Sequence, residues 1–420
     1  MSKRPDDVSF SIVERNVLQE LGGLLNTEHA SGSRSAMLVQ RLQEGDRPAR
    51  DGYALVENDA VVALSLRDQN LAVLPASLDR LTSLRVLDLA GNRLTTLPES
   101  LGRLPRLQKL VLNGNQLTGL PESLADLTTL ETLHLYGNHL TALPECFAQL
   151  SRLKDLSLGH NRFSAFPDAL WSLTTLQNLN LAENQLTFLP EAIGALAHLH
   201  TLDLGHNHLT TLPESLGNLT HLTFFLYLHD NHLTALPASL FEHLDHLRYL
   251  NLSGNALTAL PENLGNLRSL MELRVSHNQL TKLPASVGHL GQLKYLDLTD
   301  NQLGTLPEIL GDLEQLREMR LSNNQLTSLP SSPGSFKHLT TLDLRANRLS
   351  TLPASLRNLE HLRWLDLRAN RLVSFPPGLD KLPELEKLDL RWNDLSVSSH
   401  VCESLESRGC MVYVSTAGLE

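Results

Sequence analysis

Cysteine, aromatic residues and positive charge are all scarce in this 420-residue sequence. Three cysteines are too few for a disulfide scaffold and indicate a reducing compartment. The formal net charge of −11 argues against nucleic acid as the main partner, because no basic stripe is available for phosphates. The N-terminal residues lead into no apolar run typical of a secretory signal, and no apolar stretch reaches the length of a membrane span. We therefore expect a cytoplasmic protein without a membrane span.

Motifs that carry catalytic or cofactor chemistry are also absent. The sequence contains no GxxxxGK[ST] phosphate loop, no HExxH helix, no CxxC pair at metal spacing and no GxSxG nucleophile turn. We therefore expect no enzyme activity, no catalytic residues and no cofactor.

Leucine, in contrast, recurs at a regular interval. Residues 199–213 read L-x-x-L-x-L-x-x-N-x-L-x-x-L-P, and this pattern repeats from about residue 61 to residue 398. The Asn position returns every 23 residues with two steps of 24, and Gln69 holds that place in the first of fifteen copies. A period of this length with this leucine pattern predicts a leucine-rich-repeat solenoid. The asparagines are Asn92, Asn115, Asn138, Asn161, Asn184, Asn207, Asn231, Asn255, Asn278, Asn301, Asn324, Asn347, Asn370 and Asn393.

Each position of the repeat has a physical role. Leu202 and Leu204 alternate with polar residues, which predicts a short strand with both leucines directed inward. Stacked copies would form one parallel sheet, and the Asn amide would satisfy backbone groups where the strand turns away. The Leu-Pro pair and the run Glu214–Leu219 predict an extended segment and a short 3₁₀ turn on the outer side. The predicted fold class is an α/β-type solenoid with a parallel concave sheet.

The two ends of the chain depart from the repeat. In residues 1–60, apolar spacing predicts an amphipathic helix near 9–25, a short second helix over 37–42, and a hairpin formed by 53–56 and 61–66. Two interpretations are open for this segment: a cap over the end of the solenoid, or a separate docking element. Residues 61–398 form the predicted solenoid. Residues 399–420 are expected to be a C-terminal cap, with a helix followed by a final strand.

The repeat unit L-x-x-L-x-L-x-x-N-x-L-x-x-L-P-x-x-L/I-x-x-L resembles that of intracellular leucine-rich-repeat proteins. It is similar to the plant Ras-group-related proteins, the animal Ras-pathway scaffolds and many bacterial cytosolic repeat proteins. The resemblance covers about four fifths of the chain. It implies a scaffold or adaptor that binds a protein partner on its concave face, as in intracellular signalling, and it implies no catalysis. The alternative function is a bacterial effector, secreted without a signal peptide, that acts on host proteins.

Histidine is concentrated in the middle of the chain. His206 and His229 would project near one another from adjacent coils, as would His208 and His232. Zinc needs three or four converging ligands, whereas parallel columns present a line of side chains. We therefore expect surface histidines here and no metal site.

Aromatic and arginine residues mark the candidate binding face. Outward strand positions of the early copies carry small polar residues, such as Thr132 and Ser157. Later copies carry the residue types that are enriched at protein-binding hot spots, although the aromatics could instead simply shield the sheet from water. One extra residue before Asn231 predicts a β-bulge at Phe225-Leu226 that re-aims the neighbouring side chains. The predicted partner-binding residues are Phe224, Tyr227, Tyr249, Arg274, Tyr295, Arg320, Arg345, Trp364, Arg368, Arg391 and Trp392.

The arginines of the last copies alternate with aspartates. Asp343, Asp366 and Asp389 precede Arg345, Arg368 and Arg391 by two residues each. These columns could form a mutually compensating lattice of ion pairs, or a charged docking surface. Both interpretations are open. The identity of the partner and the oligomeric state cannot be derived from the sequence.

Overall fold

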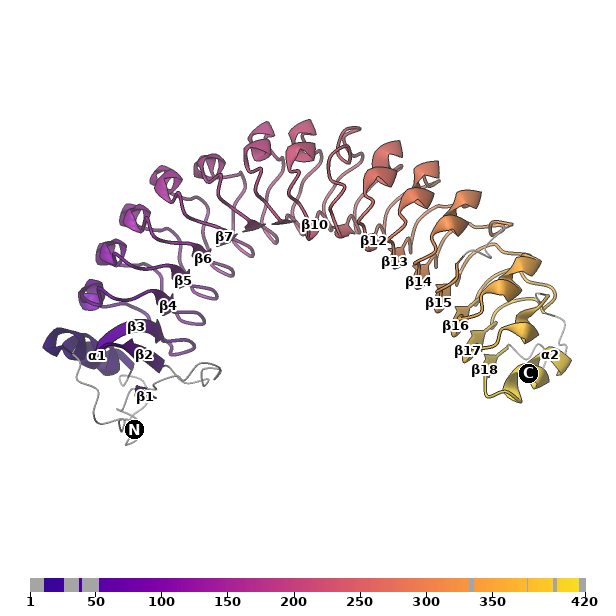
Figure 1. Cartoon of the computed structure of the whole chain (residues 1–420), viewed down its shortest axis with the longest axis horizontal. Coiled ribbons are helices and arrows are strands. Elements are labelled where there is room, and N and C mark those ends of the chain that lie inside the picture. The colour runs from indigo at the N-terminus through magenta and orange to yellow at the C-terminus, as the bar shows by residue number, and fades with distance from the viewer. Residues whose placement is uncertain are drawn as a thin grey trace. The chain divides into compact units, whose positions relative to one another are not determined.

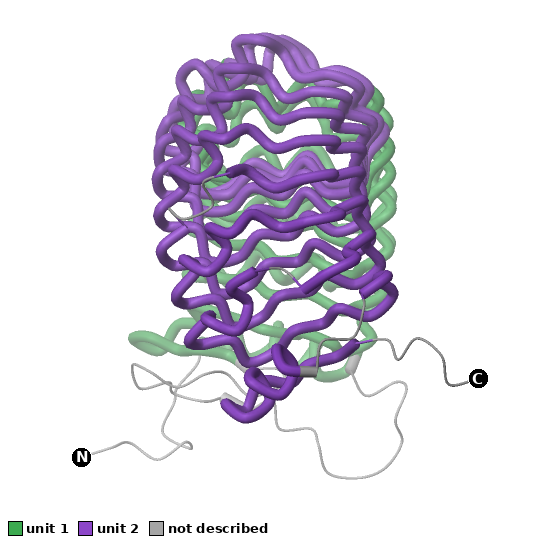
Figure 2. The backbone as a smooth tube through the Cα atoms, turned by 90° about the vertical axis from the view of Figure 1, so that its right-hand side faces the viewer, with its two compact units in different colours: residues 1–187, 195–202 green, residues 188–194, 203–420 purple. Residues whose placement is uncertain are grey.

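The computed structural model describes residues 11–25, 38–39, 53–331, 336–375, 377–395 and 399–414. The chain divides into two compact units (Figure 2). Unit 1 comprises residues 1–187 and 195–202, and unit 2 comprises residues 188–194 and 203–420. Each unit is a stack of coils, and each is described by itself below.

Parallel strands form the inner side of each unit, and short 3₁₀ helices lie on the opposite side of the coils (Figure 1). In unit 1, β3 to β8 pair in parallel with their leucines in register. In unit 2, β10 to β18 also pair in parallel, with Met319 and Val412 in place of the central leucine in β14 and β18. The predicted leucine-rich-repeat solenoid is therefore confirmed. The repeat strands are β3 (Ala60–Ser65), β4 (Val86–Asp88), β5 (Lys109–Val111), β6 (Thr132–His134), β7 (Asp155–Ser157), β8 (Asn178–Asn180), β9 (Thr201–Asp203), β10 (Phe225–Tyr227), β11 (Tyr249–Asn251), β12 (Glu272–Arg274), β13 (Tyr295–Asp297), β14 (Glu318–Arg320), β15 (Thr341–Asp343), β16 (Trp364–Asp366) and β17 (Lys387–Asp389).

The core consists of leucine columns that run along the stack. In unit 2, Leu226, Leu250 and Leu273 occupy the central position of successive strands, and all three are fully buried. Complete burial of a leucine side chain contributes about 1.5–3 kcal/mol to stability, and a single coil has too few leucines to enclose them. Stacking therefore supplies the core that one repeat cannot form.

Most of the outer turns are 3₁₀ helices that begin after a proline, as the sequence predicts, whereas η14 begins after Gly378. Pro121 stands before η4 with φ −69°, and the N–H of Leu127 donates to the carbonyl of Leu124 to close the turn. Proline suits this place because its fixed φ matches the extended entry and it has no N–H to satisfy. The 3₁₀ helices are η2 (Ala76–Arg80), η3 (Glu99–Arg103), η4 (Glu122–Asp126), η5 (Glu145–Gln149), η6 (Asp168–Ser172), η7 (Glu191–Ala195), η8 (Glu214–Asn218), η9 (Glu262–Asn266), η10 (Ala285–His289), η11 (Glu308–Asp312), η13 (Ala354–Asn358) and η14 (Leu379–Lys381).

The repeated asparagines connect neighbouring coils. The Asn231 side chain accepts a hydrogen bond from the N–H of Leu209 at 2.9 Å. Its amide donates to the carbonyls of Leu204 and Leu228, at 3.0 and 3.1 Å. Asn231 is buried, and one side chain thus satisfies backbone groups of two coils. This is the role that the repeat pattern predicts for the Asn position.

The N-terminal helix α1 (Ile12–Leu25) agrees with the predicted helix near residues 9–25. The hydroxyl of Ser11 accepts the N–H of Glu14, which resembles a capping box, and the Glu14 carboxylate accepts the N–H of Val61 in the first coil. Val17 and Leu21 are buried, so one face of α1 is covered. These contacts are the ones expected of a cap.

The remaining N-terminal predictions have different outcomes. The predicted hairpin is confirmed as β2 (Tyr53–Glu57) paired antiparallel with β3. The predicted second helix over residues 37–42 is wrong, because Leu38 and Val39 form strand β1 (Leu38–Val39), which pairs in parallel with β2. An open edge of β2 can recruit extended backbone, and this pairing overrides the weak local helical spacing. The loop predicted between residues 26 and 35 lies outside the described residues.

The C-terminal end forms one additional, degenerate coil, as predicted. Helix α2 (Ser399–Glu406) is followed by Gly409 at φ 87° and by β18 (Met411–Tyr413), which pairs in parallel with β17. Cys410 is buried and Cys402 is half-buried, and both are free thiols. Burial raises the pKa of both thiols, so neither is activated as a thiolate.

The predicted bulge in β10 is wrong. Strand β10 pairs with β11 without a register shift, and Phe225 lies opposite Tyr249. The extra residue is accommodated before the strand, where Phe224 forms a bend and its carbonyl accepts the N–H of Tyr249. A bend in the connection preserves the parallel hydrogen bonds of the strand, whereas a bulge inside it would disrupt them.

Candidate functional site

Two outward-facing columns run along the sheet of unit 2. The first strand position carries, in order, Phe225, Tyr249, Glu272, Tyr295, Glu318, Thr341, Trp364, Lys387 and Met411. The third strand position carries Tyr227, Asn251, Arg274, Asp297, Arg320, Asp343, Asp366, Asp389 and Tyr413. The central position between them holds apolar residues, which are buried in β10 to β17 because successive side chains of a strand point to opposite faces. We call these two columns the aromatic–arginine strip.

Tyr295 is the centre of the strip. The guanidinium groups of Arg274 and Arg320 lie 5.2 and 5.3 Å from its ring centroid, on neighbouring strands. Both distances allow cation–π attraction. Burial, reinforced by the Asp297 carboxylate and opposed by Arg320, raises the pKa of Tyr295 to about 12. Tyr295 is therefore a neutral phenol near pH 7 and can donate a hydrogen bond.

The arginines beside Tyr295 are held in place by glutamates of their own strands. The Nε of Arg320 donates to Glu318 at 2.7 Å, and the Nε of Arg274 donates to Glu272 at 2.5 Å. About half of each arginine side chain stays exposed. A guanidinium has five N–H donors, so these ion pairs leave further donors available at the surface.

The aromatic side chains at the start of the strip come from β10 and β11. The rings of Phe225 and Tyr227 stack with centroids 4.5 Å apart, and burial raises the pKa of the Tyr227 hydroxyl. Tyr249 is half-buried beside Phe225. Phe224 lies just before β10, 50% exposed, with the Arg248 guanidinium 5.8 Å from its ring. The sequence analysis predicted Phe224 in the first outward column, but the structure places Phe225 there. The difference arises because the prediction put the extra residue inside the strand.

At the other end of unit 2, cations again lie over aromatic rings. The Lys387 ammonium is 5.4 Å from the ring of Trp364 and 5.8 Å from that of Tyr413. The Arg391 guanidinium is 5.4 Å from Trp392, which is 62% exposed. Sequence reasoning missed Lys387 and Tyr413. Extending the strand register by one coil into the predicted final strand would have found Tyr413.

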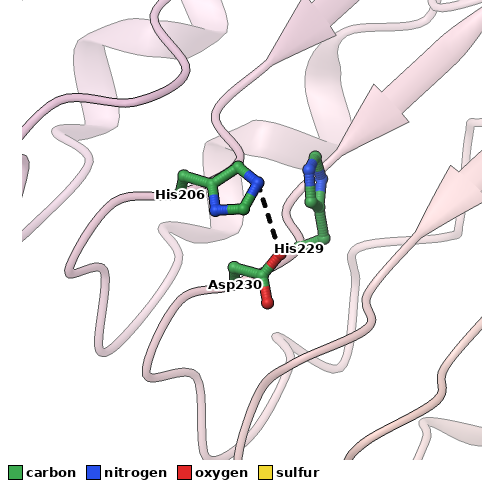
Figure 3. Close-up of side chains that lie close together, drawn as sticks. All are labelled: His206, His229 and Asp230. Carbon is green, nitrogen blue, oxygen red and sulfur yellow. Dashed lines mark ion pairs between the residues drawn. The ribbon is translucent and has the colours of Figure 1, made fainter. Parts of the chain in front are cut away.

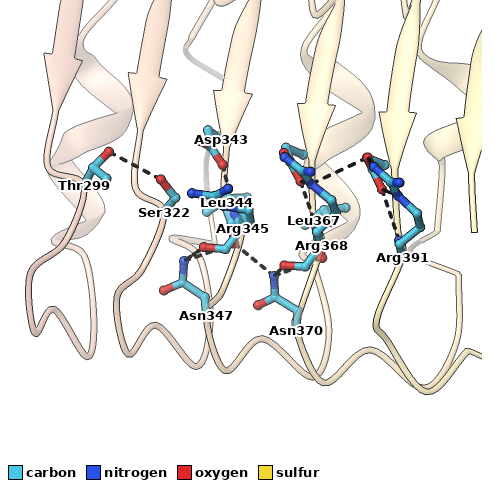
Figure 4. Close-up of polar contacts among 12 residues, drawn as sticks. Thr299, Ser322, Asp343, Leu344, Arg345, Asn347, Leu367, Arg368, Asn370 and Arg391 are labelled. Atoms are coloured by element: carbon cyan, nitrogen blue, oxygen red, sulfur yellow. Dashed lines mark hydrogen bonds and ion pairs between the residues drawn. The ribbon is translucent and has the colours of Figure 1, made fainter. Parts of the chain in front are cut away.

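The Asp–Arg columns form compensated pairs in the last two repeats (Figure 4). Arg368 donates from Nε and an Nη to the buried carboxylate of Asp366, at 2.9 and 2.5 Å. Arg391 does the same with Asp389, at 2.9 and 2.6 Å. Although burial acts to raise it, hydrogen bonds from Arg391 leave the pKa of Asp389 below its ordinary value. The lattice interpretation therefore holds for these two pairs.

Arg345 differs from the other two arginines. Its backbone N–H donates to Asp343 at 3.0 Å, but among the described residues its guanidinium has no ion pair. Burial, together with the nearby Asp366 carboxylate, raises the pKa of Asp343. The Arg345 guanidinium thus lacks the paired hydrogen bonds that Arg368 and Arg391 make to aspartate, although its charge acts to lower the pKa of Asp343.

A second group of polar side chains lies where the strands turn. The residue just before the repeat Asn has a left-handed backbone, with φ 52° at His206 and 51° at Asp230. The Nε2 of His206 lies 3.4 Å from a carboxylate oxygen of Asp230, and the ring of His229 stands beside them (Figure 3). One donor atom from each of the three residues lies within 4.8 Å of the other two. The sequence analysis expected the histidine columns not to converge on a metal ion. It considered histidines alone and did not include Asp230.

The glycine of the preceding coil makes room for His229. A Cβ atom on Gly205 would lie 2.2 Å from the Cε1 atom of the His229 ring. Gly205 is therefore buried beneath the imidazole, although the sequence pattern predicts it to point outward. Burial lowers the pKa of His229, and its Nδ1 is buried without a hydrogen-bond partner.

Unit 1 has a hollow beside the corners where its own strands turn. Its volume is about 380 Å³, and its lining includes His139, His160, Arg162 and Glu183 from successive corners. The Nδ1 of His160 lies 2.8 Å from a carboxylate oxygen of Glu183. This hollow contains one histidine–carboxylate pair, and His139 also lines it, but among the described residues three converging donors are found only at His206, His229 and Asp230.

Comparisons with known proteins agree on the family. Residues 60–186 match the family described as "Leucine rich repeat", residues 174–218 match "Leucine Rich repeats (2 copies)", and residues 236–407 match "Leucine-rich repeat region". A leucine-rich-repeat protein of Leptospira interrogans is 35% identical, with a TM-score of 0.70 over 83% of this chain and 94% of that one. The chain belongs to the leucine-rich-repeat family. No curated protein matches it significantly.

Two further solved structures resemble the chain. A plant peptide hormone receptor, RGFR1 in complex with RGF2, is 28% identical with a TM-score of 0.71, over 84% of this chain and 57% of that one. An internalin, InlF of Listeria monocytogenes, is 27% identical with a TM-score of 0.64, over 72% of this chain and 86% of that one. The fold thus supports a general role in protein–protein interaction. Among the described helices, none is both long and apolar enough to cross a membrane.

Proposed function

We propose that this chain is a protein-binding solenoid and that the aromatic–arginine strip of unit 2 binds an extended segment of a protein partner. The observation that carries the proposal is Tyr295 held between Arg274 and Arg320 on a half-exposed sheet face. Tyrosine, tryptophan and arginine are the residue types that contribute most at protein interfaces. Here the ion pairs and cation–π contacts restrict these side chains before a partner arrives, which lowers the entropy cost of binding.

The chemistry of the strip favours a segment with apolar side chains and exposed backbone carbonyls or carboxylates. Apolar side chains would contact the aromatic rings, and the unused N–H groups of the arginines would donate to oxygen acceptors. The Arg345 guanidinium, which has no ion pair among the described residues, adds a site for a carboxylate. Similarity to a plant peptide hormone receptor in complex with RGF2 supports recognition of a peptide-like partner.

A peptide display selection on the immobilised chain, followed by calorimetry with the selected peptides, tests this proposal. We expect Tyr249→Ala with Tyr295→Ala to weaken binding by at least about 2 kcal/mol, about thirty-fold in Kd, without unfolding the chain. The matched control is Thr132→Ala with Ser157→Ala, at outward strand positions of unit 1. Loss of binding in the control pair, with the tyrosine pair unaffected, would place the site on unit 1 and overturn the proposal.

We propose a cytoplasmic adaptor, in intracellular signalling, as the cellular role. The free thiols of Cys146, Cys402 and Cys410 support a reducing compartment. Fractionation of the source cells tests this location. Recovery of the chain from the culture medium of intact cells would instead support the effector alternative.

A further inference from the structure

We propose that His206, His229 and Asp230 form a binding site for a divalent first-row transition metal ion such as Zn²⁺. Each residue contributes one donor atom, and the three atoms lie within 4.8 Å of one another on adjacent coils (Figure 3). Two imidazole nitrogens and one carboxylate oxygen are the ligand types that Zn²⁺, Co²⁺ and Ni²⁺ accept, whereas Mg²⁺ and Ca²⁺ prefer oxygen alone. This proposal is independent of the proposed peptide binding.

The distances are close to those of a tetrahedral site. Ligand bonds of about 2.0–2.1 Å place two ligands of a tetrahedral ion about 3.3 Å apart. The His206 Nε2 and the Asp230 carboxylate oxygen are already 3.4 Å apart. Both side chains are about half exposed, which leaves them room to rotate toward His229 and a shared ion. Three protein ligands leave at least one coordination position open to water.

His229 distinguishes this group from the other corner pairs. His160 with Glu183, and His277 with Asp300, are also histidine–carboxylate pairs in the same corner column, at 2.8 and 3.2 Å. Among the described residues, only the group at His206 has a third donor of this kind. The ring of His229 fits there because Gly205 lacks a Cβ, whereas Ser276 occupies the equivalent place beside His277.

The burial of one ring nitrogen of His229 favours a ligand role. Its Nδ1 is buried without a hydrogen-bond partner, which is costly for a polar atom unless another contact compensates it.

Titration calorimetry of the untagged full chain with Zn²⁺, paired with visible absorption of the Co²⁺ complex, tests the site. We expect one tight equivalent, a Co²⁺ spectrum of low coordination number, and no competition from Mg²⁺. The variants His206→Asn, His229→Ala and Asp230→Asn should each weaken Zn²⁺ binding at least tenfold. Asparagine is chosen at positions 206 and 230 because it tolerates a left-handed backbone. Circular dichroism of each variant establishes that it is folded.

The matched control is His277→Asn, which removes a histidine at the same corner position, also paired with a carboxylate. A second control, His232→Ala, disrupts the stacked pair of His208 and His232, whose ring centroids are 5.5 Å apart. Both controls should retain the tight equivalent. Absence of tight Zn²⁺ binding by the wild-type chain, or an equal loss in either control, would overturn the proposal.

Discussion

Replacing Asn231 with Ala tests the role of the asparagine column. The substitution removes the only hydrogen-bond acceptor that the structure shows for the buried N–H of Leu209. An orphaned buried donor costs about 1–3 kcal/mol. The carbonyls of Leu204 and Leu228 lose one donor each but keep another, from Asn207 and Asn255 respectively. The total expected loss is therefore about 2–4 kcal/mol, dominated by the Leu209 N–H.

Urea denaturation followed by circular dichroism measures this loss, with Asn251→Ala as the matched control. Asn251 faces outward on β11, and among the described residues its side chain accepts only the N–H of Ser253, at 3.1 Å. We expect its replacement to cost less than about 1 kcal/mol. Because long repeat arrays can lose two-state behaviour, the slope of unfolding free energy against urea must agree among the variants. Equal losses at Asn231 and Asn251 would refute the assigned role.

The variant Asn231→Asp separates the acceptor from the donor. An aspartate still accepts the Leu209 N–H, but its ionised carboxylate would face the carbonyl oxygens of Leu204 and Leu228 at about hydrogen-bond distance. We therefore expect Asn231→Asp to be less stable than Asn231→Ala near pH 7 and to regain stability as acid protonates the carboxylate. A variant as stable as wild type at neutral pH would contradict the donor role of the amide.

Three further results are expected from unfolding experiments. Gly205→Ala should cost about 1–3 kcal/mol by displacing the His229 ring, and His229→Ala in the same chain should remove most of that cost; a neutral Gly205→Ala would contradict the close approach. Because the pKa of His229 is lowered in the folded chain, the unfolded chain binds the proton more readily, so stability should fall as pH drops below about 6.5, and His229→Gln should reduce that slope. Because the pKa of Asp389 is lowered in the folded chain, its carboxylate stabilises the fold above about pH 4, and this contribution is lost as the pH falls through the folded pKa. Arg391→Met should therefore diminish the acid unfolding transition measured by circular dichroism. An unchanged transition would argue against the Arg391–Asp389 pair.

The fold was predictable because it depends on local, repeated chemistry. The leucine spacing, the Asn position and the Leu-Pro pair recur with the same period. The strand, the corner and the outer turn of each coil can therefore be predicted from the sequence of one repeat. The capped helix α1 and the final coil with Gly409 were also predictable, from apolar spacing and turn chemistry. In these places, residues close in the sequence determine the structure.

The sequence predictions were wrong where hydrogen bonds to a neighbouring strand, distant in the sequence, determine the local structure. Local spacing favours a helix around Leu38, but the edge of β2 pairs with that segment as a strand. The residue inserted before Asn231 could lie anywhere between two leucines; the need to keep β10 in register with β11 places it at Phe224 and directs Phe225 outward. Hydrogen bonds to a neighbouring strand cannot be read from the spacing of one repeat.

The candidate sites illustrate the same division. The sequence alone identifies the aromatic and arginine residues of the later copies, because an outward position follows from alternation along a strand. Only the tertiary structure places Arg274 and Arg320 on either side of Tyr295, and only it brings His206, His229 and Asp230 together. These contacts depend on the register between coils, on side-chain rotamers and on the space above Gly205. The repeat period determines which column a residue occupies, and packing between coils determines which side chains meet.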